Sequence, residues 1–174
     1  MSSFFGILAS RHDQEIGVTP ALTAMEKAGV SFQVHEYRHD PANTAYGMEA
    51  VEALGLEAGQ VFKTLLVMLD GNTRRLAVGI IPVPCQLDLK AIARILGVRK
   101  AGMADGRLAE KTTGYVLGGI SPLGQKKKLP TVLDTSALAF DTIFVSGGRR
   151  GLEIELTPAT LLSLCQASTA VLCR

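Results

Sequence analysis

A long apolar run that ends in a tight turn constrains the fold most. Residues 61–69 are apolar apart from a lysine and the threonine after it, and Asp70-Gly71 follows directly. An aspartate–glycine pair between two apolar runs is a strong signal for a two-residue β-hairpin loop. Residues 76–83 are apolar again and supply the returning strand. The chain is therefore expected to contain a long buried hairpin around which the remainder packs.

Helices are predicted where a capping residue precedes an apolar stripe and a glycine follows it. Thr19-Pro20 begins one helix that Gly29 ends, and Asp88 begins another that Gly97 ends. Residues 47–54 and 104–111 have helical patterns, and Thr157-Pro158 opens a last helix through Leu164. Further strands are predicted at residues 32–37, 98–102, 113–120, 131–134, 142–145 and 152–156.

Hairpins mixed with helices indicate an α+β fold, a mixed α/β single compact domain around a curved mixed sheet. The length of 174 residues fits one domain. Hydrophobic residues make up 47% and charged residues 20% of the chain, a globular balance. Because no glycine-rich phosphate motif follows a strand, nucleotide-phosphate folds are disfavoured.

Residues 1–17 are interpreted as a variable N-terminal extension and residues 18–174 as the domain. The apolar stretch at residues 4–9 lacks a basic leader and is too short for a secretory core. No later segment reaches the roughly 20 apolar residues that span a bilayer. We therefore expect a cytoplasmic protein without a membrane partner.

The cysteines and histidines suggest neither a metal site nor a redox pair. Cys85, Cys165 and Cys173 lack CxxC spacing, and a sparse, odd set is typical of a reducing compartment. Cys85 is the one thiol considered for reactivity, although an inert thiol is the better interpretation. The three histidines have no ligand spacing. We expect no metal and no cofactor.

Candidate chemistry lies in a lysine and two glycine turns. Lys63 is either a surface lysine at the strand start, which periodicity favours, or a cation that points into a cleft. The turns at Gly118-Gly119 and Ser146-Gly147-Gly148 allow close backbone approach and can expose N–H donors to a carbonyl oxygen. Each turn alone is more often a simple turn, but the combination suggests a site built largely from backbone.

Basic residues cluster although the formal net charge is only +2. Each cluster alone is best interpreted as a solvated turn, whereas several around one cleft would attract a polyanion. The clusters are Lys126-Lys127-Lys128, Arg149-Arg150, Arg74-Arg75 and Arg99-Lys100.

Several collinear motifs resemble the YbaK family, free-standing relatives of the editing domain inserted in bacterial prolyl-tRNA synthetases. The resemblance implies a curved, barrel-like mixed sheet with flanking helices and hydrolysis of mischarged Cys-tRNA(Pro). The motifs are Phe62-Lys63-Thr64-Leu65, Leu87-Asp88-Leu89-Lys90, Met103-Ala104-Asp105, the run from Thr113 to Lys127, and Val145 to Leu152.

The resemblance also implies site residues. Lys63 corresponds to the family lysine that anchors the substrate. The other residues assigned to substrate binding are Tyr37, Tyr46, Thr64, Gly118, Gly119, Ser121, Ser146, Gly147 and Gly148. Lys126, Lys127, Lys128, Arg149 and Arg150 are the predicted tRNA contacts.

Three functions remain open at this point: a Cys-tRNA(Pro) deacylase, a deacylase for alanine or another small residue on tRNA, and a non-catalytic module that binds tRNA or a synthetase. The intact lysine and glycine turns favour catalysis. Because no general base is evident, the family's use of the substrate thiol as nucleophile is the mechanism implied. The partners implied are tRNA(Pro) and prolyl-tRNA synthetase.

Overall fold

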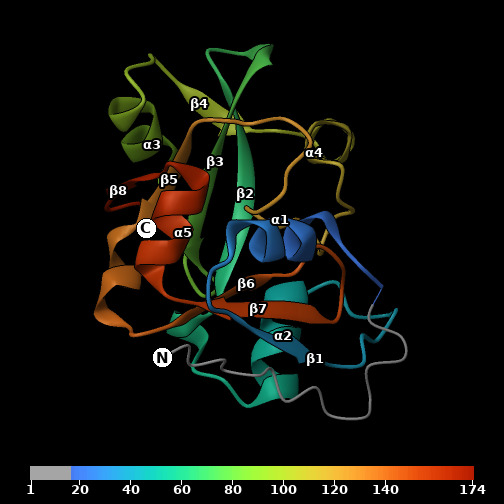
Figure 1. Ribbon diagram of the computed structural model, residues 1–174. Coiled ribbons are helices and arrows are strands. Elements are labelled where there is room, and N and C mark those ends of the chain that lie inside the picture. The colour runs from blue at the N-terminus through green and yellow to red at the C-terminus, as the bar shows by residue number, and fades with distance from the viewer. Residues whose placement is uncertain (1–16) are drawn as a thin grey trace.

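The computed structural model describes residues 17–174 (Figure 1). The predicted N-terminal extension thus lies outside the described residues except for Gly17. The helices are α1 (Pro20–Ala28), α2 (Tyr46–Leu54), α3 (Leu89–Ile95), α4 (Gly106–Thr113) and α5 (Pro158–Cys165), with short 3-10 turns at Ala58–Gln60 and Thr135–Ala139. The strands are β1 (Gln33–Glu36), β2 (Phe62–Leu69), β3 (Asn72–Pro82), β4 (Ala101–Met103), β5 (Thr131–Asp134), β6 (Ile143–Ser146), β7 (Leu152–Leu156) and β8 (Ser168–Ala170).

The strands form two sheets. A five-stranded mixed sheet has the order β4-β2-β3-β5-β8, and a three-stranded antiparallel sheet has the order β1-β7-β6. The sheets meet at a parallel bridge between Val61 and Phe144. The α+β class is confirmed. The expectation of a barrel-like sheet is not supported, because the strands of residues 17–174 form two open sheets with free edges.

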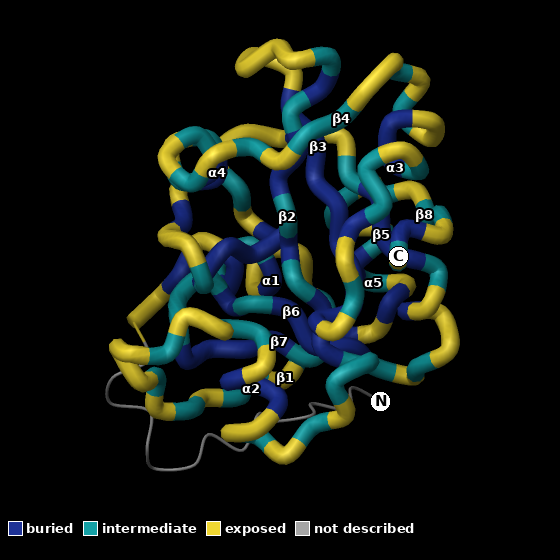
Figure 2. Tube along the Cα trace, turned by 180° about the vertical axis from the view of Figure 1, so that it is seen from behind, coloured by how far each residue is buried: buried dark blue, intermediate teal, exposed yellow. Residues whose placement is uncertain are grey.

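The predicted hairpin is confirmed, and it separates two cores. Asp70 and Gly71 both have positive φ, 52° and 69°, as a two-residue type I′ loop requires. Alternate side chains of β2 and β3 point to opposite faces. One face packs against α1 and α5, which lie in front of β2 and β3 in Figure 1, and the other face packs against α3. Figure 2 shows that β3 is buried along most of its length.

The helix boundaries follow the predicted caps. Thr19, Asp88 and Thr157 accept hydrogen bonds from amides in the first turns of α1, α3 and α5. Such side-chain caps satisfy amides that the helix leaves without partners. Gly29 ends α1 with φ 65°. None of the helices in residues 17–174 is long and apolar enough to cross a membrane.

The strand predicted at residues 113–120 is wrong, because this segment forms turns after α4. Part of its backbone is satisfied locally: the Gly119 amide donates to the Val116 carbonyl, and the Leu117 amide donates to the Glu110 carboxylate. Tyr115 and Ile120 are still buried. Their apolar character therefore reflects core packing without strand pairing. The short strand β8 was not predicted.

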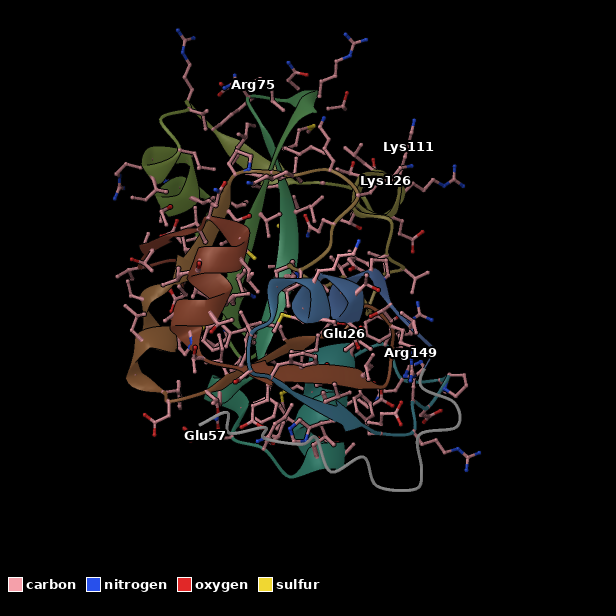
Figure 3. The ribbon with its side chains drawn as sticks, in the orientation of Figure 1. Glu26, Glu57, Arg75, Lys111, Lys126 and Arg149 are labelled. Atoms are coloured by element: carbon pink, nitrogen blue, oxygen red, sulfur yellow. A yellow bond between two sulfur atoms is a disulfide. The ribbon has the colours of Figure 1, made fainter. Side chains whose placement is uncertain are left out.

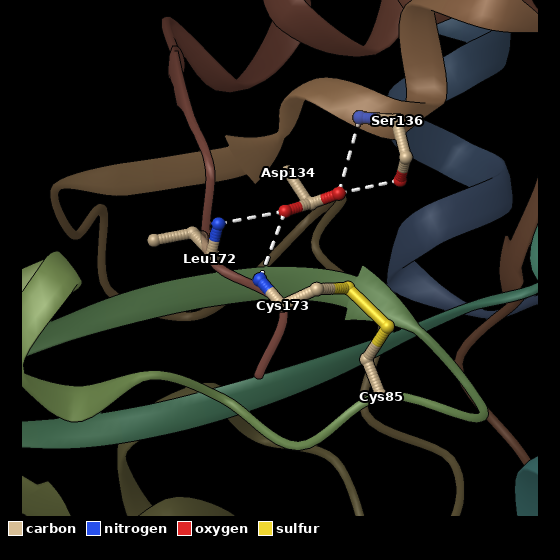
Figure 4. Close-up of a disulfide and its surroundings, with 5 residues drawn as sticks. All are labelled: Cys85, Asp134, Ser136, Leu172 and Cys173. Atoms are coloured by element: carbon tan, nitrogen blue, oxygen red, sulfur yellow. Dashed lines mark hydrogen bonds between the residues drawn. A yellow bond between two sulfur atoms is a disulfide. The ribbon is translucent and has the colours of Figure 1, made fainter.

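The expectation of three unpaired cysteines is also wrong. Cys85, in the turn after β3, forms a disulfide with Cys173 near the C-terminus (Figure 4). The carboxylate of Asp134 holds the same segment, because it accepts hydrogen bonds from the amides of Leu172 (2.7 Å) and Cys173 (3.1 Å). The 88-residue separation of the two cysteines explains why spacing did not reveal the pair. Cys165 is free.

We predict that removing this disulfide destabilises the protein measurably. The crosslink closes a long loop, and such crosslinks typically contribute about 2–4 kcal/mol to the free energy of unfolding. The double variant Cys85→Ser/Cys173→Ser should lose about this much in urea denaturation of oxidised protein. Dithiothreitol should lower wild-type stability similarly and leave the double variant unchanged. Cys165→Ser is the matched control, and a wild-type protein insensitive to reduction would contradict the prediction.

Candidate functional site

A cavity of about 480 Å³ lies where the start of β2 meets the N-terminus of α2, the loop after α4, and strands β6 and β7. Its wall is mostly apolar, with a few polar groups. The lining residues are Ala45, Tyr46, Gly47, Met48, Val61, Phe62, Lys63, Thr64, Leu65, Val83, Leu117, Gly118, Ile120, Ser146 and Glu153. Five of the predicted substrate-binding and catalytic residues are therefore brought together.

Lys63 is the cation of this cavity. It lies in β2 opposite Ile81 of β3. Burial lowers the pKa of its ammonium, because an apolar surrounding disfavours the charged form. Of the two alternatives for Lys63, a surface lysine or a cation in a cleft, the structure therefore supports the cation in a cleft. A half-buried ammonium of this kind suits an anionic or carbonyl-bearing ligand.

Glu153 is the acidic group of the cavity, and sequence reasoning missed it. It lies in β7 between His35 of β1 and Ser146 of β6 in register, and only 7% of its surface is exposed. Burial raises the pKa of its carboxyl to about 8. No ion pair within 4 Å joins Glu153 to Lys63 in the described part of the chain, so both groups remain available to a ligand.

The sequence contained an ambiguous signal for Glu153. Alternation along Leu152–Leu156 places Glu153 and Glu155 on the face opposite the apolar residues, which normally faces solvent. Here α2 and the start of β2 cover that face. Glu155 is paired with His35, whose Nε2 lies 2.7 Å from its Oε2. Glu153 has no such side-chain partner among residues 17–174.

The two predicted glycine turns pack directly against each other. A methyl group on Gly119 would lie 2.8 Å from the Arg149 Cα atom, and one on Gly118 would lie 2.6 Å from ring atoms of Tyr46. Only glycine permits these approaches. The Arg150 guanidinium lies 4.8 Å from the centre of the Tyr46 ring, and its Nε donates to the Leu117 carbonyl at 2.8 Å. Arg150 thereby joins both turns to Tyr46.

Most backbone amides of these turns already have acceptors. The Gly119 amide donates to Val116, the Gly147 amide to Leu152, and the Gly148 amide to the Ser146 hydroxyl. For the Gly118 amide, no acceptor is found among residues 17–174. Gly118 lines the cavity, so its N–H is one backbone donor that a ligand carbonyl could use, together with the uncapped first-turn amides of α2, which also lie in the cavity wall.

Thr64 contributes a second group without a partner. Its Oγ1 is buried and makes no hydrogen bond to any residue of the described chain. Leaving a buried hydroxyl unpaired costs about 1–3 kcal/mol, so such groups are rare outside functional sites. Thr64 follows Lys63 in β2 and also lines the cavity, although alternation along the strand points its side chain to the opposite face from that of Lys63.

The remaining predicted site residues lie around the cavity rather than in its wall. Tyr37 lines a smaller neighbouring hollow of about 320 Å³, and burial together with the charge of Glu153 raises the pKa of its hydroxyl to about 12. Ser121 is fully buried, and its hydroxyl accepts from the Leu123 amide. Gly119, Gly147 and Gly148 support the turns described above.

The predicted tRNA contacts fall into two kinds. Lys126, Lys127 and Lys128 are exposed, and Lys126 extends from the surface near Lys111 in Figure 3. The two arginines are partly used within the protein. Arg149 forms an ion pair with Glu36, and Arg150 contacts Tyr46.

Replacing Glu153 with glutamine should change how stability depends on pH. Because the folded-state pKa of about 8 lies above the ordinary value of 4.5, the folded protein binds an extra proton between these values, and stability falls as pH rises through this window. Glu153→Gln should therefore be more stable than wild type above pH 8, by a few kcal/mol at most. Below pH 4.5 the two proteins should match.

Urea unfolding at pH 5, 7 and 9 measures this effect. Glu57→Gln is the matched control, because Glu57 is exposed on another part of the surface. A constant difference between Glu153→Gln and wild type at all three pH values would contradict the buried, protonated carboxyl.

Comparison with known proteins identifies the family of this chain. The model of the aminoacyl-tRNA editing domain matches residues 39–164. A protein named as a Cys-tRNA(Pro)/Cys-tRNA(Cys) deacylase, EbsC of Enterococcus faecalis, is 38% identical over 152 residues, which are 87% of this chain and 91% of the relative. The Ser/Thr-tRNA deacylase ProXp-y of Escherichia coli K12 is 31% identical over 68% of this chain and 72% of its own length.

Solved structures agree with the sequence comparisons. A structure described as a trans-editing enzyme for prolyl-tRNA synthetase is 28% identical and superposes with a TM-score of 0.77, over 89% of this chain and 95% of the other. The matched residues include the cavity wall and both glycine turns. The chain belongs to the family of aminoacyl-tRNA editing domains.

Proposed function

We propose that this chain, an aminoacyl-tRNA hydrolase, removes cysteine from mischarged proline tRNA. The observation that carries the proposal is a mostly apolar cavity lined by Lys63 and by Gly118, whose amide has no acceptor among residues 17–174. The 38% identity to a relative named for cysteine-charged tRNA supports the choice of amino acid. A synthetase pocket cannot strongly exclude a residue as close in size as cysteine, so a second site is needed.

Different parts of the cavity wall can bind different parts of the aminoacyl end of such a substrate. The apolar wall formed by Phe62, Val83 and Ile120 receives a small side chain. The Gly118 N–H donates to the ester carbonyl and stabilises the negative charge that develops on its oxygen. Lys63 anchors the substrate through its carbonyl or a nearby phosphate oxygen.

Glu153 gives the cavity a group that responds to the substrate. A carboxyl with a pKa of about 8 is mostly protonated at pH 7, so in most molecules it cannot accept a proton until it ionises. A substrate α-ammonium beside it would favour its ionised form. We assign to Glu153 the recognition of this ammonium, with Tyr37 supporting it from the neighbouring hollow.

Because Glu153 is assigned to the substrate ammonium, the nucleophile in this proposal comes from the substrate. The cysteine sulfur attacks its own ester carbonyl, a carbon–sulfur bond forms, and the carbon–oxygen bond to the ribose breaks. The ribose oxygen leaves with the proton that the thiol gives up. The cyclic thioester then opens with water. The protein supplies positioning and oxyanion stabilisation, which together account for a large part of many enzymatic rate enhancements.

Recognition of the tRNA itself is proposed to be electrostatic. The exposed run Lys126–Lys128 is suited to phosphates, with Arg149 and Arg150 adding charge near the cavity. Selection of tRNA(Pro) would then come from a prolyl-tRNA synthetase partner. Such a role belongs in the cytoplasm, where tRNA is charged.

A second candidate is the removal of serine or threonine from tRNA. The 31% identity to a Ser/Thr-tRNA deacylase favours it. Alanine on tRNA(Pro) and binding without catalysis are further alternatives. A panel of Cys-, Ser-, Thr-, Ala- and Pro-charged tRNA(Pro) distinguishes these possibilities, since cysteine should be released fastest and a binding module should release none.

Lys63→Ala should lower kcat/KM for deacylation by at least about 100-fold, which is effectively a loss of activity, while the protein stays folded. The ammonium is the cation of the cavity wall, and its loss removes the substrate anchor. Lys27→Ala, at an exposed lysine of α1, is the matched control and should retain wild-type rates. Wild-type turnover by a folded Lys63→Ala protein would remove Lys63 from the site.

The thiol mechanism predicts that Ser-tRNA(Pro) binds but resists hydrolysis. A serine hydroxyl is nearly isosteric with the thiol but far less nucleophilic at neutral pH. Single-turnover rates at saturating enzyme compare the two substrates at equal occupancy. Comparable rates would instead indicate an activated water, and the thiol mechanism would have to be abandoned.

A further inference from the structure

The charges of this protein are strongly separated along the chain. Residues 70–128 contain eleven lysines and arginines against four aspartates and glutamates. The remaining described residues, 17–69 and 129–174, contain six basic residues against ten acidic ones. The small net charge of the chain therefore hides a basic segment, residues 70–128, which we call the basic part. It includes the β2–β3 hairpin tip, β4, α4 and the loop that follows α4.

All four carboxylates of the basic part are engaged with backbone amides. Asp88 and Asp105 cap α3 and α4, Glu110 accepts from the Leu117 amide, and Asp70 accepts from two amides near the hairpin tip. Of the eleven cations, only Arg75 has a carboxylate within 4 Å among the described residues. The cations thus face solvent largely without acidic neighbours.

Asp70 brings two basic pairs together at the tip. One carboxylate oxygen accepts from the amides of Arg99 (3.0 Å) and Lys100 (3.1 Å), and the other accepts from the Arg75 guanidinium at 3.2 Å. The turn before β4 is thereby fixed beside the β2–β3 turn. We call the four cations the hairpin platform: Arg74, Arg75, Arg99 and Lys100, all exposed.

The hairpin platform is separate from the cavity. In Figure 3, Arg75 marks one end of the molecule, and Arg149, which packs against the Gly118-Gly119 turn, lies far below it. Asp70 lies seven residue steps after Lys63 along the extended β2 chain, which is roughly 23 Å at about 3.3 Å per residue. Lys111 and Lys126 lie between Arg75 and Arg149 in this view (Figure 3).

We infer that the hairpin platform binds phosphates of the duplex stem of tRNA while the aminoacylated end occupies the cavity. This inference rests on the proposed function. The platform lies roughly 23 Å from Lys63 along β2, so a tRNA whose single-stranded 3′ end enters the cavity would bring the paired backbone of its stem towards it. Arg74, Arg99 and Lys100 have no carboxylate within 4 Å among the described residues, and such free cations are suited to phosphate oxygens.

The composition of the tip favours RNA over a protein partner. Residues 70–75 contain no apolar side chain, whereas the centres of protein–protein interfaces are typically rich in aromatic and apolar residues. The tip also has no aromatic residue on which a base could stack. The platform should therefore bind RNA backbone without reading its sequence.

The double variant Arg74→Glu/Lys100→Glu tests this inference. It spares Arg75, whose pairing with Asp70 holds the tip. The matched control is Lys27→Glu/Arg174→Glu, which makes the same charge change at two exposed positions outside the basic part. Circular dichroism and thermal unfolding verify that both variants fold.

The first measurement is binding of uncharged tRNA(Pro) transcript as a function of salt. Each phosphate contact contributes about 0.7–0.9 to the slope of log K against log salt, so the platform variant should lose between one and two from this slope. Its affinity at low salt should fall about ten-fold or more, while the control keeps the wild-type slope. An unchanged slope in the platform variant, or an equal loss in the control, would overturn the inference.

The second measurement compares deacylation of full-length Cys-tRNA(Pro) with that of a short cysteinylated oligonucleotide that contains only the single-stranded 3′ end. The platform variant should raise KM about ten-fold for the full-length substrate and leave kcat and the short substrate unaffected. Equal KM values for wild type and variant on full-length substrate would refute the platform. If wild type deacylates neither substrate, the proposed function fails, and the binding measurement still decides on the platform.

Discussion

The antiparallel pairing of β2 with β3 is the interaction on which the rest of the structure depends. It runs from Phe62 opposite Pro82 to Leu69 opposite Asn72. Because side chains alternate, the hairpin contributes to both of the larger cores at once. The remaining strands of the five-stranded sheet build on this hairpin: β4 pairs with β2, β5 pairs with β3, and β8 pairs with β5. The hairpin is buried on both faces over most of its length, which explains why its sequence is nearly continuous in apolar residues.

The same hairpin also places the functional groups. Its open end carries Lys63 and Thr64 into the cavity wall, and its closed end holds the hairpin platform through Asp70. A rigid strand pair thus keeps the proposed chemical site and the proposed RNA contact at a fixed separation. Sites built on strands are held more accurately than sites on loops, which suits a reaction that depends on positioning.

The features predicted from the sequence share a local physical cause. The Asp70-Gly71 turn needs positive φ at two consecutive residues, and the helix starts at Thr19, Asp88 and Thr157 need side-chain acceptors. Such requirements leave a signature within a few residues. The features that were missed depend on distant segments. The Cys85–Cys173 pair and the covering of Glu153 by other elements leave no local signature. Residues 113–120 were misjudged because apolar residues in a folded loop resemble those of a strand.

Lys63 and Glu153 together indicate how an apolar cavity can recognise a charged substrate. Burial lowers the pKa of the lysine and raises that of the glutamate, so each group is shifted towards its neutral form and neither pairs with the other. A direct ion pair would stabilise both charges in the absence of substrate and would have to be broken on binding. With the two groups held apart, a substrate that carries an ammonium and a carbonyl dipole can restore favourable interactions to both. Part of the cost of burying these groups is then recovered only when an aminoacyl ester is present, which favours aminoacyl ends over uncharged tRNA.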